Sequence, residues 1–273
     1  MRVIVLTSQL QGFASHCIPV LMSKNNIKIA MIVINDNKTS SKHAWYKNKL
    51  RKITKIGIIG AVNGIRMRKW YSKDINSYID IKNLYDISDT LNLTIKSTPE
   101  INCRETIDLF KEANADLGLS LGNSYINSEV FSIPKYGMIN AHHELLPEFQ
   151  CAQSIIWQIY EGSLKTGYTI HQIDSGIDTG NIIYKEDMQI EVKPTLGETV
   201  SHNYARLFKA SADKLADIVD NYDKFSVNTK AQKSGRLFTT PTFKQYCKMI
   251  KQHKRLYQKM LNNHDKRMRR DEN

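Results

Sequence analysis

Two apolar runs near the start of the chain decide the predicted fold: RVIVLTS at residues 2–8 and IKIAMIVIN at residues 27–35. Both are rich in β-branched residues and end in polar ones, which is typical of a buried strand. Between them, Phe13, Cys17 and Leu21 recur at the spacing of one helical face. Strand, helix and strand in this order predict an α/β fold in which helices cover a parallel sheet.

The alternation continues, so we predict a Rossmann-like, doubly wound, mostly parallel sheet with helices on both faces. The apolar patterns predict further strands at residues 91–97, 115–122, 137–141, 168–173 and 181–191, and helices at residues 103–113 and 154–160. Thr195-Leu196-Gly197-Glu198 has the form of a capping box, which starts a helix. An apolar stripe at helical spacing extends that helix to about Asp220.

Composition narrows the class of protein. Of the 273 residues, 41% are hydrophobic and 24% are charged, as in ordinary globular proteins. The four cysteines are far apart and form no C-x-x-C pair, so we expect no zinc site, no disulfide framework and a reducing compartment. The first apolar run is too short for a secretory signal, and no run approaches the roughly 18–20 apolar residues that span a bilayer. We therefore expect a soluble, cytoplasmic protein.

The net charge of +12 is concentrated in two blocks. Residues 38–73 contain eleven Lys or Arg and no acidic residue, and residues 224–273 contain fourteen against three acidic residues. The rest of the chain is therefore net acidic. Such blocks favour phosphate-bearing or polycarboxylate partners, although a solvated helix face has the same composition.

Two polar clusters follow predicted strands. Asn140-Ala141-His142-His143-Glu144 lies at the end of one strand, and residues 174–180 (DSGIDTG) follow another. In an open parallel sheet, ligands bind at the carboxyl ends of the strands. An imidazole can shuttle a proton, an amide can stabilise an oxyanion, and a carboxylate can orient the imidazole. These residues could form an acyl-transfer site, or they could be ordinary turn residues and a structural histidine.

The stretch NAHHELLP at residues 140–147 resembles the Asn-x-His-x-x-Leu-Leu-Pro signature of the folate-dependent formyltransferases. The resemblance continues through Trp157, Gly162, TGYTIH at residues 166–171 and the Asp178-Thr179-Gly180 turn. It covers roughly residues 1–220 and is strongest over 137–183. The family includes glycinamide ribonucleotide transformylase, methionyl-tRNA formyltransferase and the nucleotide-sugar N-formyltransferases.

The resemblance implies a catalytic triad of Asn140, His142 and Asp178. An acceptor amine would attack the formyl group of 10-formyltetrahydrofolate, the cosubstrate, without a metal and without a covalent enzyme intermediate. Asn140 and protonated His142 would hold the oxyanion, His142 would protonate the leaving nitrogen, and Asp178 would orient His142 and help to deprotonate the amine. The residues expected to line the pterin pocket are Gly122, Asn123, Ser124, Tyr125 and Ile126.

Four nearby residues receive no catalytic role in this interpretation. His143 could contact the substrate or be exposed, and we favour exposure. His171, after an apolar strand, is expected to be a packed histidine with satisfied hydrogen bonds. Gln150-Cys151 replaces the Arg-Gly pair of many family members and borders the acceptor side, so the acceptor is less certain than the chemistry.

The resemblance leaves several acceptors open, all small anionic amines or tRNA. A nucleotide-linked amino sugar of surface polysaccharide synthesis fits best, because the first strand is not followed by the glycine-rich phosphate loop of the glycinamide ribonucleotide enzymes. Methionyl-tRNA is the alternative, since its enzymes carry a basic loop after the second strand. Those enzymes also carry a larger C-terminal domain than the residues after 220 would form. A non-catalytic, basic nucleic-acid-binding protein is a second alternative.

The resemblance also suggests how the chain is divided. We expect residues 1–222 to be the formyltransferase catalytic domain, with residues 38–73 as a basic insertion. Residues 223–273 are expected to be a basic, helical C-terminal appendage. Sugar-modifying members of the family are often dimers, so a homodimer is compatible with the sequence.

Overall fold

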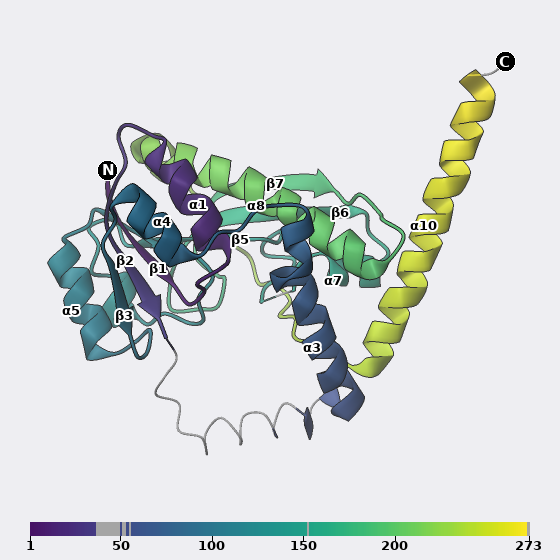
Figure 1. Cartoon of the computed structure of the whole chain (residues 1–273), viewed down its shortest axis with the longest axis horizontal. Coiled ribbons are helices and arrows are strands. Elements are labelled where there is room, and N and C mark those ends of the chain that lie inside the picture. The colour runs from purple at the N-terminus through teal and green to yellow at the C-terminus, as the bar shows by residue number, and fades with distance from the viewer. Residues whose placement is uncertain (37–49, 51–52, 55, 152, 272–273) are drawn as a thin grey trace.

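The computed structural model describes residues 1–36, 50, 53–54, 56–151 and 153–271. In these residues, seven strands form one sheet in the order β3-β2-β1-β4-β5-β6-β7 (Figure 1). The neighbouring strands among β3, β2, β1, β4 and β5 are parallel, whereas β6 is antiparallel to both β5 and β7. The predicted mostly parallel α/β sheet is confirmed. The strands are β1 (Arg2–Thr7), β2 (Lys28–Asn35), β3 (Ile95–Thr98), β4 (Leu117–Ser120), β5 (Met138–His142), β6 (Lys165–Gln172) and β7 (Ile182–Gln189).

Helices cover both faces of the sheet (Figure 1). Val5 packs into a large apolar cluster with α1, α3, α4 and α8, and its neighbour Ile4 packs into a smaller cluster with α5 and α6. Successive strand residues point to opposite faces, so β1 contributes to both layers. The helices are α1 (Phe13–Met22), α3 (Ile58–Ser72), the 3₁₀ helix η1 (Asp74–Ser77), α4 (Leu84–Leu91), α5 (Arg104–Ala113), α6 (Ser128–Phe131), α7 (Ile156–Glu161), α8 (Leu196–Asp220), α9 (Tyr222–Ser226) and α10 (Phe243–Asp271).

Helix α8 starts at the predicted capping box. The Thr195 hydroxyl accepts a hydrogen bond from the Glu198 N–H at 3.2 Å, and the Glu198 carboxylate accepts one from the Thr195 N–H at 3.0 Å. These bonds satisfy donors that a helix start leaves free. The helix then buries a long apolar face against α1 and β6.

The structure differs from the predicted elements mainly between β2 and β3. A strand is predicted at residues 91–97, but α4 occupies residues up to Leu91 and β3 starts only at Ile95. Asn92 ends α4 with a φ of 52°, a left-handed conformation that asparagine tolerates. Part of the predicted basic insertion, residues 58–72, is helix α3. Residues 38–49, 51–52 and 55 of that insertion lie outside the described residues.

The order of the strands determines where a ligand can bind. The chain builds β1, β2 and β3 outward in one direction and then returns to place β4 on the other side of β1. At such a switch point, the loops after the two central strands diverge and leave a crevice at their carboxyl ends. Ligands of open α/β sheets bind in this crevice.

The long helix α10 extends beyond the body of the protein in Figure 1. Its first half packs against α7 and α3, and Tyr246 and Met249 belong to the large apolar cluster. The predicted helical nature of this segment is therefore confirmed, while its separation from residues 1–222 as a distinct appendage stays a prediction. Within the described residues, no helix combines the length and the apolar character needed to cross a bilayer.

Candidate active site

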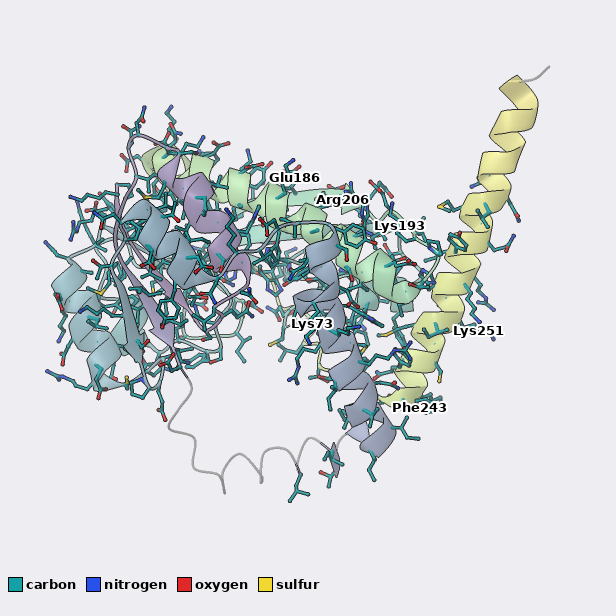
Figure 2. All side chains as sticks on the ribbon, in the orientation of Figure 1. Lys73, Glu186, Lys193, Arg206, Phe243 and Lys251 are labelled. Carbon is teal, nitrogen blue, oxygen red and sulfur yellow. The ribbon has the colours of Figure 1, made fainter. Side chains whose placement is uncertain are left out.

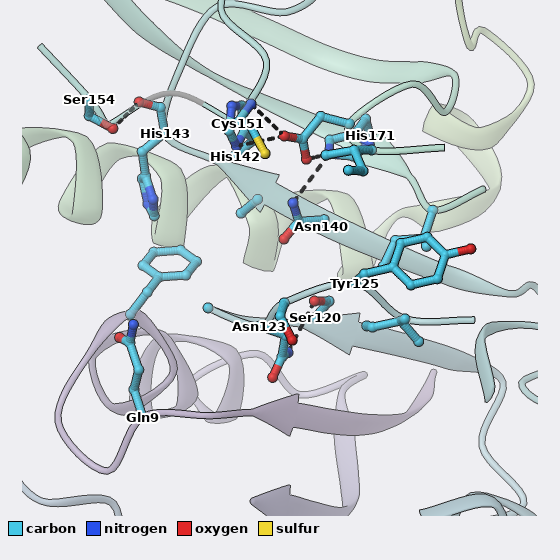
Figure 3. A pocket seen from close by; sticks show the side chains of 18 of the residues that line it. Gln9, Ser120, Asn123, Tyr125, Asn140, His142, His143, Cys151, Ser154 and His171 are labelled. Carbon is cyan, nitrogen blue, oxygen red and sulfur yellow. Dashed lines mark hydrogen bonds and ion pairs between the residues drawn. The ribbon is translucent and has the colours of Figure 1, made fainter. Parts of the chain in front are cut away.

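A cavity of about 430 Å³ lies where β4 and β5 end (Figure 3). Its volume falls in the range of small-molecule pockets, roughly 300–1,000 Å³. All the residues that the sequence predicts for catalysis and folate binding line it: Asn140, His142, Asp178, Gly122, Asn123, Ser124, Tyr125 and Ile126. The structure therefore brings together residues from three separate loops and strand ends.

Strand β5 carries two of the predicted catalytic residues. Asn140 and His142 are two positions apart, so their side chains point to the same face of the strand. The His142 Nε2 atom lies 3.1 Å from the carbonyl oxygen of Phe149, and Nδ1 lies 3.8 Å from the carboxylate of Asp178. A carbonyl oxygen can only accept, so Nε2 carries a proton. Each ring nitrogen of His142 therefore faces an oxygen acceptor.

Asp178 comes from the loop between β6 and β7. Its backbone has a φ of 54°, and Asp174 stabilises the turn by accepting hydrogen bonds from Gly176 and Thr179. The Gln232 amide donates to the carbonyl oxygens of Asp178 and Gly180 at 3.1 and 2.6 Å. These bonds hold the Asp178 carboxylate at the pocket, where its side chain is only 16% exposed.

The main chain of Cys151 also contacts this carboxylate. The Cys151 N–H donates to Oδ2 of Asp178 at 3.0 Å, the same oxygen that faces His142. Burial and the nearby Asp178 charge raise the pKa of the Cys151 thiol. Cys151 thus acts here as a backbone donor, and a raised pKa disfavours the reactive thiolate.

His171 is packed with satisfied hydrogen bonds, as expected, and it also contacts two residues of the candidate triad. On the antiparallel strand β6 it lies directly opposite Asn140, and its Nε2 atom is 3.2 Å from the Asn140 amide nitrogen and 3.7 Å from Oδ1 of Asp178 (Figure 3). Burial, followed by the His142 charge, lowers the pKa of His171 to about 4. Its Nδ1–H donates to the carbonyl oxygen of Gln172 at 2.8 Å. Neutral His171 therefore accepts a hydrogen bond from Asn140 and fixes the orientation of that amide.

The predicted pterin loop forms a second wall of the pocket. Gly122 has a φ of 83°, which favours glycine. The side chain of Asn123 is fully used within the protein, because it donates to Leu6 and Ser120 and accepts from Ser8. Tyr125 is 48% exposed. A ligand at this wall would therefore meet main-chain groups and the Tyr125 ring rather than the Asn123 amide.

The opposite wall is aromatic, and one expectation fails there. His143 is expected to be exposed, but it is buried between Phe13, Tyr204 and Phe208. Burial, together with the charges of His142 and His16, lowers the pKa of His143 to about 3. Its Nε2 atom lies 3.1 Å from the Ser211 hydroxyl, which gives this nitrogen a hydrogen-bond partner. The pattern of apolar residues around position 143 gives no sign of this, because the covering helix α8 is distant in sequence.

The charges around the pocket are unlike those of the whole chain. Asp174 and Asp178 line the pocket, and no Lys or Arg is among its described lining residues. The net charge of +12 is therefore not concentrated at this site. The described residues also contain no group of three or more His, Cys, Asp or Glu arranged to hold a metal ion.

Comparison with known sequences assigns the segment that contains this site. Residues 86–219 match the family model described as formyl transferase. Methionyl-tRNA formyltransferase of Clostridium tetani is 34% identical over 131 residues, which cover 48% of this chain and 41% of that protein. The enzyme of the same name from Ehrlichia ruminantium is 32% identical over 139 residues, covering 50% of this chain and 46% of that protein. The chain thus spans less than half the length of these curated relatives.

Solved structures share the fold over a larger part of the chain. Phosphoribosylglycinamide formyltransferase from Anaplasma phagocytophilum matches with a TM-score of 0.55 at 14% identity, over 88% of this chain and 99% of that chain. The N-formyltransferase from Helicobacter canadensis, in complex with folinic acid and dTDP-3-aminofucose, matches with a TM-score of 0.50 at 16% identity, over 87% of this chain and 70% of that chain. At these identities, the likeness shows the fold.

The fold and the matched segment together define the class of protein. The sheet is the one found in formyltransferases, and the match runs from α4 to α8 and includes Asn140, His142 and Asp178. Over residues 86–219 the chain is therefore similar to the formyl transferases.

Proposed function

We propose that this chain is a 10-formyltetrahydrofolate-dependent N-formyltransferase that transfers the formyl group to a primary amine. The observation that carries the proposal is the shared pocket. An amide, an imidazole and a carboxylate, from Asn140, His142 and Asp178, line it together with the loop at residues 122–126. The likeness to formyl transferases over residues 86–219 supports the same chemistry.

The pocket suits a folate cosubstrate. A pterin ring needs an apolar slot with main-chain hydrogen-bond groups, and Ile126, Ile173 and the Tyr125 ring line the pocket beside the main chain of residues 122–126. The 10-formyl group supplies an electrophilic carbon. The loop and the three candidate residues line the same pocket, so a bound formyl group would sit close to all three.

The three side chains divide the work of the transfer. One N–H of Asn140 donates to His171, which leaves the second N–H for the oxyanion that forms when the amine attacks. Protonated His142 adds positive charge near the oxyanion and gives its proton to the leaving nitrogen as the old C–N bond breaks. Asp178 accepts the proton that the attacking amine loses, directly or through water, so charge and protons balance.

For the acceptor, we propose the amine of a nucleotide-linked amino sugar. The Helicobacter canadensis enzyme, which shares the fold, was solved with dTDP-3-aminofucose. Because no Lys or Arg is among the described residues that line the pocket, only the amino sugar, which carries no negative charge, is expected inside it, with the diphosphate toward basic residues outside. After α9, residues 227–242 and helix α10 carry an excess of Lys and Arg, which suits a diphosphate.

Methionyl-tRNA is the second candidate, and one observation favours it. The curated relatives reported above are methionyl-tRNA formyltransferases, and the two basic blocks at 38–73 and 224–273 suit a polyanion. The match covers only 41% of the Clostridium tetani protein, so it leaves more than half of that enzyme without a counterpart in the comparison.

A direct assay separates the candidates. The purified chain is mixed with 10-formyltetrahydrofolate and a panel of dTDP- and GDP-linked amino sugars, and in parallel with charged initiator methionyl-tRNA. Tetrahydrofolate release is followed by absorbance and the formylated product by mass spectrometry. Turnover of an amino sugar but not of methionyl-tRNA is the expected result. Turnover of methionyl-tRNA alone would replace the acceptor, and turnover of neither would refute the proposed enzyme.

A further inference from the structure

Helix α3 carries a row of apolar side chains that no described residue covers. Ile58, Ile59, Val62 and Ile65 are exposed to 75%, 56%, 59% and 67%. Ile58, Val62 and Ile65 are spaced four and three residues apart, so they project from the same side of the helix. Single exposed apolar residues are ordinary, but a row of them on one helix marks a surface that contacts something.

The opposite side of α3 already has its partners. Gly60, Met67 and Trp70 are buried, and Trp70 lies against Gly197 at the start of α8. The Gly60 position also approaches the backbone of Phe243, where α10 begins. The helix is therefore packed against the body along one side, and the apolar row points away from the body. We call Ile58, Ile59, Val62 and Ile65 the α3 face.

Only positive charges accompany the α3 face on this helix. Arg66, Arg68 and Lys69 follow it on the same helix, and α3 contains no Asp or Glu. In the described part of the chain, Arg66 and Arg68 have no carboxylate partner, and Lys69 makes an exposed ion pair with Asp74 at 3.5 Å. Their charges are therefore available to an anionic partner.

Helix α10 adds positive charge at the same end of the molecule. Its N-terminus lies beside the end of α3 that starts at Ile58, as Figures 1 and 2 show. From Phe243 to Asn263, the helix contains no acidic residue and carries Lys244, Lys248, Lys251, Lys254, Arg255 and Lys259. The apolar row is thus accompanied by positively charged side chains on both α3 and α10.

We propose that the α3 face is a docking surface for an anionic lipid bilayer. A peripheral helix binds a membrane by burying apolar side chains at the boundary between headgroups and acyl chains, while Lys and Arg contact the lipid phosphates. Juxtaposed basic residues strengthen this binding in membranes that contain anionic lipids. Ile58, Ile59, Val62 and Ile65 supply the first component, and Arg66, Arg68 and Lys69 supply the second.

Two other occupants fit the α3 face less well. In a two-fold symmetric dimer the same patch meets itself, so a second copy would bring the cations of α3 toward those of its partner. RNA would use the basic residues, but it contacts proteins through phosphates, 2′-hydroxyls and stacked bases, which aliphatic side chains do not recognise. A lipid surface uses both the aliphatic and the basic groups.

Sedimentation with lipid vesicles tests the proposal independently of formyl transfer. The full chain is incubated with phosphatidylcholine vesicles that contain phosphatidylglycerol, and separately with pure phosphatidylcholine vesicles. The double variant Ile58→Ser, Val62→Ser removes two apolar side chains and keeps every charge. Val227→Ser is the matched control, because Val227 is 78% exposed but lies outside the α3 face.

The natural chain and the Val227→Ser control should pellet with the anionic vesicles and not with the neutral ones. The double variant should bind the anionic vesicles about tenfold more weakly or worse, with an unchanged circular dichroism spectrum. Equal binding by the double variant would show that charge alone attracts the lipid. It would overturn the proposed role of the α3 face. Absence of binding of the natural chain to anionic vesicles would also overturn the proposal. This holds even if the double variant abolishes self-association or RNA binding.

Discussion

Two buried histidines lie near the candidate triad. Of the two, His171 hydrogen-bonds to a residue of the triad, and His143 to Ser211. His171 contacts Asn140 and Asp178, whereas His143 is held between aromatic rings and Ser211. Burial lowers the pKa of His171 to about 4 and that of His143 to about 3. Both rings are therefore neutral in the folded protein at neutral pH.

These lowered pKa values predict that the protein becomes less stable in mild acid. Between pH 6.5, the ordinary pKa of histidine, and about 4, the unfolded chain binds protons at both positions and the folded chain does not. Stability is thus fully present above pH 6.5 and is lost as the pH falls, by up to about 1.4 kcal/mol per pH unit for each histidine. Denaturant titrations at a series of pH values measure this slope, and His143→Gln should make it shallower. Equal slopes for the variant and the natural chain would contradict the assignment of a neutral, buried His143.

The candidate triad could be predicted from the sequence because the motif places Asn140 and His142 two residues apart at the end of a strand. His171 could not, because its contact with Asn140 depends on the register of β5 against β6, in which the two residues pair directly. A signal was present: a histidine in the strand before the aspartate loop. Its meaning depends on that strand being antiparallel, which the apolar pattern does not reveal.

The turn after β6 determines the position of Asp178. Gly180 closes this turn so tightly that an added Cβ atom would lie 1.9 Å from the carbonyl oxygen of Gln172. Any side chain at this position must displace the backbone next to Asp178. The hydrogen bonds that Asp174 and Gln232 make to this turn depend on its present backbone position, so they would not restore Asp178 after such a shift.

We therefore predict that Gly180→Ala impairs catalysis more than folding. A displacement of about 1 Å in a reacting group can cost about a hundredfold in rate, so kcat should fall at least tenfold. Gly60→Ala is the matched control, because its Cβ atom would meet Ile56 at an ordinary 3.4 Å. Steady-state kinetics and thermal unfolding of both variants measure the effect. Normal kcat in Gly180→Ala would contradict the role of this turn.

At the scale of elements, periodicity located the strands and helices that are buried, such as β1, β2 and α8. It missed the short helices α4, α6 and α9, since so few residues give little periodicity, although it found the equally short α7. The boundary between α4 and β3 was wrong for a related reason. Asn92 ends the helix through a left-handed conformation, which the apolar pattern around it does not encode.

At the scale of the whole molecule, the first part of the C-terminal helix α10 packs into the main apolar core. Met249 of α10 is completely buried and belongs to the same apolar cluster as α1 and α8, whereas Met260, three turns further along, is 38% exposed. The sequence predicted a basic helical appendage from charge, and charge does not reveal which face of a helix is buried. The inner half of α10 is structurally part of the body.

This arrangement predicts different effects for two methionines on one helix. Met249→Ala should destabilise the whole chain by about 2–5 kcal/mol, because it leaves a cavity in the core. Met260→Ala should change the unfolding free energy by less than about 1 kcal/mol. Urea denaturation followed by circular dichroism measures both. A small effect of Met249→Ala, or a separate transition for α10, would support a detachable appendage instead.

The proposed formyl transfer depends most on the Asp178 carboxylate of the candidate site. Asp178→Asn keeps the size of the side chain and an oxygen that can accept the Cys151 N–H, but it removes the charge that faces His142. The decisive measurement is the single-turnover rate of formyl transfer from 10-formyltetrahydrofolate to the acceptor amine that the assay panel identifies. We predict a fall of at least about a hundredfold, with folate affinity nearly unchanged. A variant that transfers the formyl group at the natural rate would contradict the proposed mechanism.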